Sequence, residues 1–108
     1  MVETADQGMA PTVTVEAVSW VTRFVGGDGS SRVNIPEPLA ADDTALSVLR
    51  RISRRYPDLA RMLWTPAGDL AEHVQVMINN AIAGPEEVVA HRLRPGDTVS
   101  LLGQYMGG

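Results

Sequence analysis

The chain has 108 residues, of which 44% are apolar, and this is enough for the core of one small domain. Its net charge of −4 argues against a general nucleic-acid binder. It contains no cysteine, which excludes disulfides, thiolate metal sites and a cysteine nucleophile. All nine basic residues are arginine, and the two histidines, His73 and His91, are too few and too far apart to suggest a metal cluster.

The first eleven residues, MVETADQGMAP, are polar or small and are expected to form a disordered arm. They have neither the basic stretch nor the apolar run of a signal peptide, and no apolar run in the chain approaches the roughly 20 residues of a membrane span. These features predict a cytoplasmic protein.

Two short strands are predicted next. TVTVEA alternates from residue 12, and the alternation slips at Val18, which we interpret as a bulge or an early bend. GGDGSS at 26–31 predicts a loop, since glycine accepts positive φ angles. RVNI at 32–35 predicts a second strand that Pro36 and Pro38 end.

A helix is predicted after residue 44. Asp42, Asp43 and Thr44 offer N-cap oxygens, and Pro57 is expected to stop the helix. The apolar stripe at helical spacing consists of Ala45, Val48, Leu49, Ile52 and Tyr56. DLARMLW at 58–64 suggests a further short helical turn, and TPAGD at 65–69 a loop.

Two more strands complete the domain. HVQVMIN alternates, and Asn79-Asn80 suits a turn because asparagine tolerates left-handed backbone. The segment 81–93 fits no single element. Pro95-Gly96-Asp97 predicts a turn before a last strand, TVSLL. The order β-β-α-β-β predicts a small α+β domain with its helix on one face of a sheet.

The chain ends in Gly107-Gly108. Glycine has no side chain to pack or to form a cap, and its backbone has the highest conformational entropy of any residue. A diglycine end is therefore useful mainly when the terminal carboxylate itself reacts.

These features together resemble the MoaD/ThiS family of ubiquitin-like sulfur carrier proteins. In that family a Gly-Asp turn opens the last strand, which then leads into a tail ending in Gly-Gly. Gly96-Asp97 and Gly107-Gly108 match both parts. RRYPDLARML resembles the end of the family's helix and HVQVMINN its third strand, while the loops GGDG and TPAGDL are most similar to the CysO-like branch.

The resemblance implies a β-grasp fold with a four-to-five-stranded mixed sheet over residues 12–102, after the arm at 1–11 and before a flexible tail at 103–108. It implies a protein cosubstrate that is not an enzyme and binds no cofactor. A ubiquitin-activating-like adenylyltransferase would use ATP to adenylate the carboxylate of Gly108, which a sulfur donor would convert to a thiocarboxylate. Gly107 would give clearance, and the residues threading the partner's active site would be Gly103, Gln104, Tyr105 and Met106.

The second partner implied is a biosynthetic enzyme that accepts the sulfur. Cysteine or a sulfur-containing natural product is the favoured destination, followed by molybdopterin and then thiamine. The sequence departs from the family at Gly103-Gln104, where prolines are usual, and at the bulky pair Tyr105-Met106. Both departures concern the pathway and the partners rather than the fold.

The predicted helix carries four arginines, Arg50, Arg51, Arg54 and Arg55, with two interpretations. They form either a solvated face or a docking patch for an acidic enzyme surface. Trp20 and Trp64 are interpreted as core or loop anchors. Asp42-Asp43 are interpreted as helix caps and GGDG as a turn, and neither suggests a metal or phosphate site.

Two other classes of function remain open. A protein modifier would use the same terminus to bind lysines of target proteins, although the absence of lysine prevents lysine-linked chains of this protein on itself. A β-grasp binding module or enzyme subunit would not need Gly107-Gly108 at all.

Overall fold

The computed structural model describes residues 11–29 and 32–103. Its strands are β1 (Thr12–Val18), β2 (Arg32–Pro38), β3 (Val74–Ile78), β4 (Ala81–Ile82) and β5 (Thr98–Gly103). Its helices are the 3₁₀ helix η1 (Ser19–Val25) and the α-helices α2 (Ala45–Arg55), α3 (Pro57–Leu63) and α4 (Pro85–Ala90). Among these residues no helix is long and apolar enough to cross a membrane.

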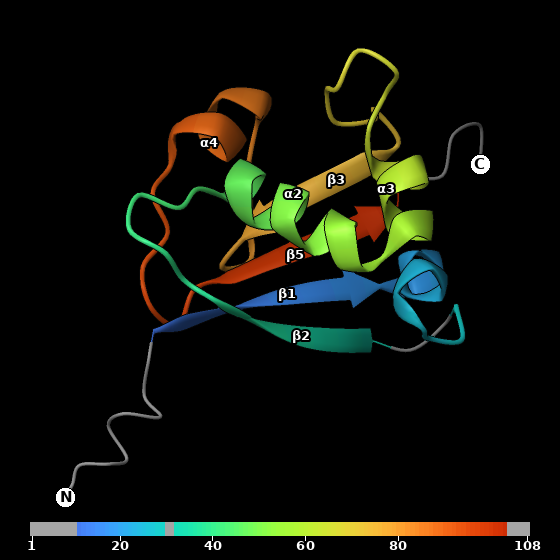
Figure 1. The fold of residues 1–108 in the computed structure, drawn as a ribbon, viewed down its shortest axis with the longest axis horizontal. Coiled ribbons are helices and arrows are strands. Elements are labelled where there is room, and N and C mark those ends of the chain that lie inside the picture. Colours follow the sequence, from blue (N-terminus) through green and yellow to red (C-terminus); the bar gives the residue numbers. More distant parts are fainter. Residues whose placement is uncertain (1–10, 30–31, 104–108) are drawn as a thin grey trace, which may run out of the picture.

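The strands form one five-stranded mixed sheet in the order β2-β1-β5-β3-β4. β1 and β5 are parallel, and the remaining neighbours are antiparallel. The last strand of the chain therefore lies in the centre of the sheet, between the first strand and β3 (Figure 1). This arrangement confirms the expected α+β class.

The core lies between one face of the sheet and the helices, with α2 crossing that face (Figure 1). Alternation along β1 and β5 places every second side chain in this core, as predicted. The predicted stripe of α2 is buried as well, and only Tyr56 at its end is half-buried. The most deeply buried side chains include Val13, Val15, Val48, Leu49, Ile52, Val99 and Leu101.

The boundaries of α2 follow from its capping residues. Thr44 is the N-cap and forms a reciprocal capping box with Ser47, whose hydroxyl accepts the Thr44 N–H at 2.9 Å. The helix ends before Pro57, as predicted, and Pro57 then occupies the first turn of α3. Proline fits there because the first-turn N–H groups of a helix have no partner within the helix.

Of the two interpretations of the slip at Val18, the bulge is wrong and the early bend agrees with the structure: β1 ends there and gives way to η1, whose period brings Val21 and Val25 into the core. One further prediction about the first hairpin is wrong. Pro36 does not end β2 but lies inside it, paired with Thr14, and Pro38, paired with Thr12, is the last residue of the strand. Proline is tolerated there because β2 is an edge strand with one side unpaired.

The remaining turns agree with the sequence. Asn79 and Asn80 both have positive φ, 51° and 70°, and join β3 to the short strand β4. Gly96 has a φ of 87° in the turn before β5. The segment 81–93, which fitted no single element, contains β4 and α4. β5 extends to Gly103, one residue beyond the predicted strand, because Gly103 pairs with Val74.

Candidate functional site

The candidate site is the C-terminal end of β5, where the chain leaves the sheet. The start of that strand is fixed by a small hydrogen-bond network. The Asn79 side-chain amide donates to Asp97 Oδ1 at 2.9 Å, and its carbonyl oxygen accepts the Thr98 N–H at 2.9 Å. The Arg94 N–H donates to Asp97 Oδ2 at 2.8 Å. The Gly-Asp turn singled out in the sequence thus ties β5 to the β3–β4 turn.

The electrostatics of Asp97 reflect this network. Partial burial acts to raise the pKa of the Asp97 carboxyl, but the hydrogen bonds from Asn79 and from the Arg94 N–H favour the ionised form. The second effect prevails, and the pKa lies below its usual value of 3.8. Asp97 is therefore a charged anchor for the turn at neutral pH.

At the other end of β5, Gly103 meets the indole of Trp20. Gly103 lies two residues after Leu101, so its helix-side face points toward the core. Trp20 fills the space that a side chain there would need, and a Cβ built on Gly103 would overlap Cε2, Cζ2 and Nε1 of the indole. Glycine is required here because of this close approach and not because of its φ.

Trp20 itself is held from two sides. Phe24, on the next turn of η1, meets it edge-on, with ring centroids 6.0 Å apart and planes at 82°. His73, just before β3, stacks on it at 6.0 Å and 24°. An edge-to-face pair at this distance has a favourable geometry. Trp20 is half-buried and packs against the core, which fits its interpretation as an anchor.

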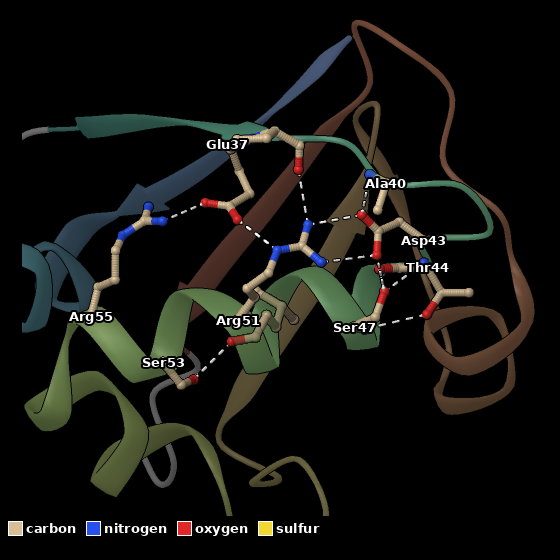
Figure 2. A network of polar contacts seen from close by, with 10 residues as sticks. Glu37, Ala40, Asp43, Thr44, Ser47, Arg51, Ser53 and Arg55 are labelled. Atoms are coloured by element: carbon tan, nitrogen blue, oxygen red, sulfur yellow. Dashed lines mark hydrogen bonds and ion pairs between the residues drawn. The ribbon is translucent and has the colours of Figure 1, made fainter. Parts of the chain in front are cut away.

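Arg51 and Arg55 of α2 belong to a second feature, an ionic network around two buried carboxylates between β2 and α2 (Figure 2). Glu37, only 2% exposed, accepts from Arg51 Nε at 2.7 Å and from Arg55 Nη1 at 2.8 Å. Arg51 also binds Asp43, 5% exposed, through both terminal nitrogens at 3.1 and 2.8 Å. A forked arginine–carboxylate pair of this kind is among the stronger side-chain hydrogen bonds.

The network shifts the ionisation of its members. The hydrogen bonds from Arg51 lower the pKa of the Asp43 carboxyl to about 2, against the opposing effect of burial. The same hydrogen bonds from Arg51 to Asp43 and Glu37 raise the pKa of the Arg51 guanidinium above its usual range. Asp43 and Arg51 therefore remain charged at physiological pH. The prediction that Asp42 and Asp43 cap α2 is wrong, because the N-cap is Thr44 and Asp42 pairs with Arg92. Asp43 instead accepts the Ser47 hydroxyl at 2.7 Å and so joins the capping box to Arg51.

The predicted docking patch is divided by these contacts. Arg50 lies over the Trp64 ring, 4.6 Å from its centroid, and donates to the Gly68 carbonyl oxygen at 3.0 Å. Arg51 and Arg55 are engaged with Glu37. Arg54 is exposed and has no hydrogen bond or ion pair with any residue within 11–29 or 32–103. The docking patch stays a prediction, with Arg54 as its most available cation.

Glu37 is a residue that sequence reasoning missed. The signal was its phase in β2, because Glu37 alternates with Val33 and Ile35 on the side that faces the core. Because the predicted strand ended before Pro36, the sequence analysis left Glu37 outside β2 and did not place its side chain in the core. Arg51 and Arg55, one helical turn apart, are spaced to meet a single carboxylate.

The other predicted site residues, Gln104, Tyr105, Met106, Gly107 and Gly108, lie outside the residues that the structure describes. Of the tail as predicted, only Gly103 is described, and it belongs to β5. Within the described part of the chain, no group of three histidine or acidic side chains could hold a metal ion.

A groove of about 510 Å³ lies between α2, the loop at 68–72, β3 and α4. Its lining is mainly apolar and includes Leu46, Leu70, Val74, Val76, Ala83 and Val88. Val89, on α4 beside it, is 58% exposed. The groove reaches Val74, the partner of Gly103 in the sheet, and so it approaches the end of β5 from the β3 side.

Solved structures share this architecture. Small archaeal modifier protein 1 from Haloferax volcanii superposes with a TM-score of 0.71 at 21% identity, over 90% of this chain and 99% of that one. The chain has the ubiquitin-like β-grasp fold. No protein-family model and no curated protein matches the sequence.

Two further β-grasp structures carry the name that the loops suggested. CysO from Mycobacterium tuberculosis matches with a TM-score of 0.60 at 20% identity, over 86% of this chain and 99% of that one. The BexX/CysO complex from Amycolatopsis orientalis matches with a TM-score of 0.60 at 23% identity, over 89% of this chain and 99% of that one. The fold class and the resemblance to CysO-like β-grasp proteins are thereby confirmed.

Proposed function

We propose that this protein is a sulfur carrier whose Gly108 carboxylate is adenylated with ATP by a ubiquitin-activating-like adenylyltransferase and then converted to a thiocarboxylate. The observation that carries the proposal is the combination of the β-grasp fold with the pair Gly107-Gly108. Gly108 lies five residues after Gly103, the last residue of the central strand β5. Five extended residues span about 17 Å, enough to enter a partner's active site from the domain surface.

The chemistry explains why such a terminus is needed. A carboxylate is a poor electrophile until adenylation supplies AMP as a leaving group. Attack by a sulfur donor on the acyl carbon then expels AMP and leaves a nucleophilic thiocarboxylate. Two glycines at the end give the reacting carbonyl access through a narrow channel because neither has a Cβ.

The absence of cysteine and lysine fits this role. An activated acyl group reacts with thiols and amines, and the chain offers neither as a side chain. The domain is accordingly a cosubstrate, and the chemistry belongs to its partners. The adenylyltransferase would come first and a sulfur-accepting biosynthetic enzyme second. The partner role of the second enzyme is supported by the BexX/CysO complex, in which a protein of this fold is bound to BexX.

The destination of the sulfur is proposed as cysteine or a sulfur-containing natural product, with molybdopterin next. The structures named CysO support this order. We place the protein in the cytoplasm, where its ATP-dependent partner would work.

Mass spectrometry of the intact protein tests the proposal. Protein purified rapidly from its host and treated with iodoacetamide is expected to carry one adduct, which tandem fragmentation places on Gly108. Because the chain has no cysteine, no other group competes strongly for the reagent. The same spectrum establishes that Gly108 is the terminal residue. A variant lacking Gly107-Gly108 is the control and should remain unmodified.

The reaction is then repeated in vitro with ATP, sulfide and the host's adenylyltransferase. An unchanged carboxylate in both experiments rejects the carrier function. Deletion of Gly107-Gly108 with full retention of activity in the host would favour a binding module or enzyme subunit.

A protein modifier is the second candidate, because the higher TM-score belongs to small archaeal modifier protein 1. In that case Gly108 would form an isopeptide bond with lysines of target proteins. Trypsin is unsuited to detect this: Pro95 blocks cleavage after Arg94 and no basic residue follows, so the branch would keep the whole segment 93–108. Cyanogen bromide cleaves after Met106 and leaves a Gly-Gly branch on the target lysine. Such branches in the host proteome, absent in a deletion strain, would establish modification.

A further inference from the structure

We propose that Trp20 is a positioning residue that clamps Gly103 and so fixes the point and direction from which the reactive C-terminal segment leaves the domain. The inference rests on the proposed function, since it concerns how the same terminus is delivered to a partner. It assigns a role to a contact that lies outside the reacting residues.

The first argument is the geometry at Gly103. The side chains of Val99 and Leu101, on the same face of β5, are fully buried in the core. At the next position on that face the indole of Trp20 takes the place of a side chain and lies against the backbone itself. The backbone of Gly103 is thus covered by Trp20 on one face and paired with Val74 at its edge.

The second argument is how Trp20 is supported. Thr22, fully buried on η1, donates its hydroxyl to the Ser19 carbonyl oxygen at 2.7 Å and accepts the Gly29 N–H at 2.8 Å. Gly27 packs so closely on Thr22 that a Cβ there would lie 2.7 Å from the Thr22 Cβ. The GGDG loop therefore fixes η1, and η1 fixes Trp20.

The loop before β3 acts from the other side. The Ala71 N–H donates to the Leu63 carbonyl oxygen at 2.8 Å, which ties this loop to the end of α3. Two residues later His73 stacks on Trp20. The GGDG loop thus supports Trp20 through Thr22 of η1, and His73, three residues past the TPAGDL loop, stacks on Trp20 itself.

The consequence concerns delivery of the terminus. A clamped Gly103 leaves only residues 104–108 to span the distance into a partner's site. When the clamp is lost, β5 can fray from its end, and the terminal carboxylate then samples a larger volume and more directions. Its local concentration in the partner's site falls, and small misplacements of a reacting group can reduce a rate about 100-fold.

A structural experiment tests the clamp without any partner. The variants Trp20→Ala, Gly103→Ala and the double variant are compared with the wild type by urea unfolding. Gly103→Ala is expected to lower the urea midpoint in the wild-type background but hardly at all beside Trp20→Ala, because the smaller side chain makes room for the new Cβ. Equal effects in both backgrounds would overturn the proposed contact.

Amide exchange measured by NMR reports the end of β5 directly. In Trp20→Ala the exchange of the last β5 amides is expected to rise about tenfold relative to amides in the middle of the strand. Trp20→Phe, which keeps an aromatic ring, serves if the alanine variant does not fold. The matched control is Trp64→Ala, because Trp64 is also half-buried but packs beside Arg50, while the atoms nearest to a Cβ at Gly103 all belong to Trp20. Unchanged exchange in folded Trp20 variants contradicts the clamp.

The functional experiment is ATP–pyrophosphate exchange with the host's adenylyltransferase. Trp20→Ala is expected to lower kcat about tenfold with KM for the carrier changed less than about twofold, because the domain still docks while its terminus arrives less often. Trp64→Ala should keep the wild-type values. An unchanged kcat in Trp20→Ala refutes the positioning role. No exchange with the wild-type protein refutes the proposed function, while the amide measurements still decide whether Trp20 holds Gly103.

Discussion

Replacing Asp43 by asparagine isolates the ionic network between β2 and α2. Asparagine keeps an oxygen for the Ala40 N–H or the Ser47 hydroxyl, which both bind Asp43 at 2.7 Å, but it loses the charge that Arg51 faces. The perturbation therefore removes the ion pair while leaving the size of the side chain unchanged.

The magnitude follows from the ionisation of Asp43. Its pKa falls from 3.8 to about 2 on folding, chiefly through the hydrogen bonds from Arg51. At about 1.4 kcal/mol for each pKa unit, this corresponds to about 2 kcal/mol of folding free energy. Because the folded-state pKa is the lower one, the contribution is complete above about pH 5 and disappears as the pH falls through about 2.

The assay is urea unfolding of the wild type and Asp43→Asn at pH 6 and pH 3. The difference in unfolding free energy is expected to be about 2 kcal/mol at pH 6 and about half of that at pH 3. Asp42→Asn is the matched control, since Asp42 is 74% exposed and its ion pair is with the exposed Arg92. Its effect should stay below about 0.5 kcal/mol at both pH values. A difference for Asp43→Asn that does not shrink on acidification would refute the reasoning.

Three further substitutions are predicted to lower the free energy of unfolding, each measured by urea denaturation. Leu101→Ala, at a fully buried position of β5, should cost about 2–5 kcal/mol because it leaves a cavity in the core. Gly27→Ala should cost about 1–3 kcal/mol because its Cβ would lie 2.9 Å from the Thr22 carbonyl oxygen, whereas Gly84→Ser, with open space and a φ of −75°, should be neutral. Asn79→Ala should cost about 1–3 kcal/mol, since it removes two hydrogen bonds to the turn before β5 and places alanine at a φ of 51°. An unchanged urea midpoint in any of these three destabilised variants would contradict the contact on which its prediction rests.

The elements that the sequence predicted correctly are those whose determinants are local. The alternation of β1 and β3 and the stripe of α2 each bury one face, and this periodicity is visible in a short window. The Asn79-Asn80 turn follows from a backbone preference of asparagine itself.

The predictions that failed depended on neighbours distant in the sequence. Pro36 was expected to end β2, and it does not because the strand lies at the edge of the sheet, a fact that only the topology supplies. Likewise Glu37 is buried because Arg51 and Arg55 reach it from α2.

The candidate site divides in the same way. Its reacting residues, Gly107 and Gly108, were predicted from the sequence motif and the family resemblance, whereas the contact of Trp20 with Gly103 joins segments more than 80 residues apart. The glycine at 103 was explained in the sequence as part of the tail. In the structure, position 103 is a glycine because the indole of Trp20 occupies the space that a side chain would need.

The central position of β5 also determines when the domain can fold. Glu16 on β1 accepts a hydrogen bond from Ser100 on β5, and 84 residues separate them. A nascent chain therefore carries β1 without its parallel neighbour until the last strand has been synthesised, and closing so long a loop slows folding. The sheet is completed by the strand that leads directly to Gly107-Gly108, so a ribosome-bound chain shorter than about 100 residues should present no folded β-grasp surface to an activating enzyme.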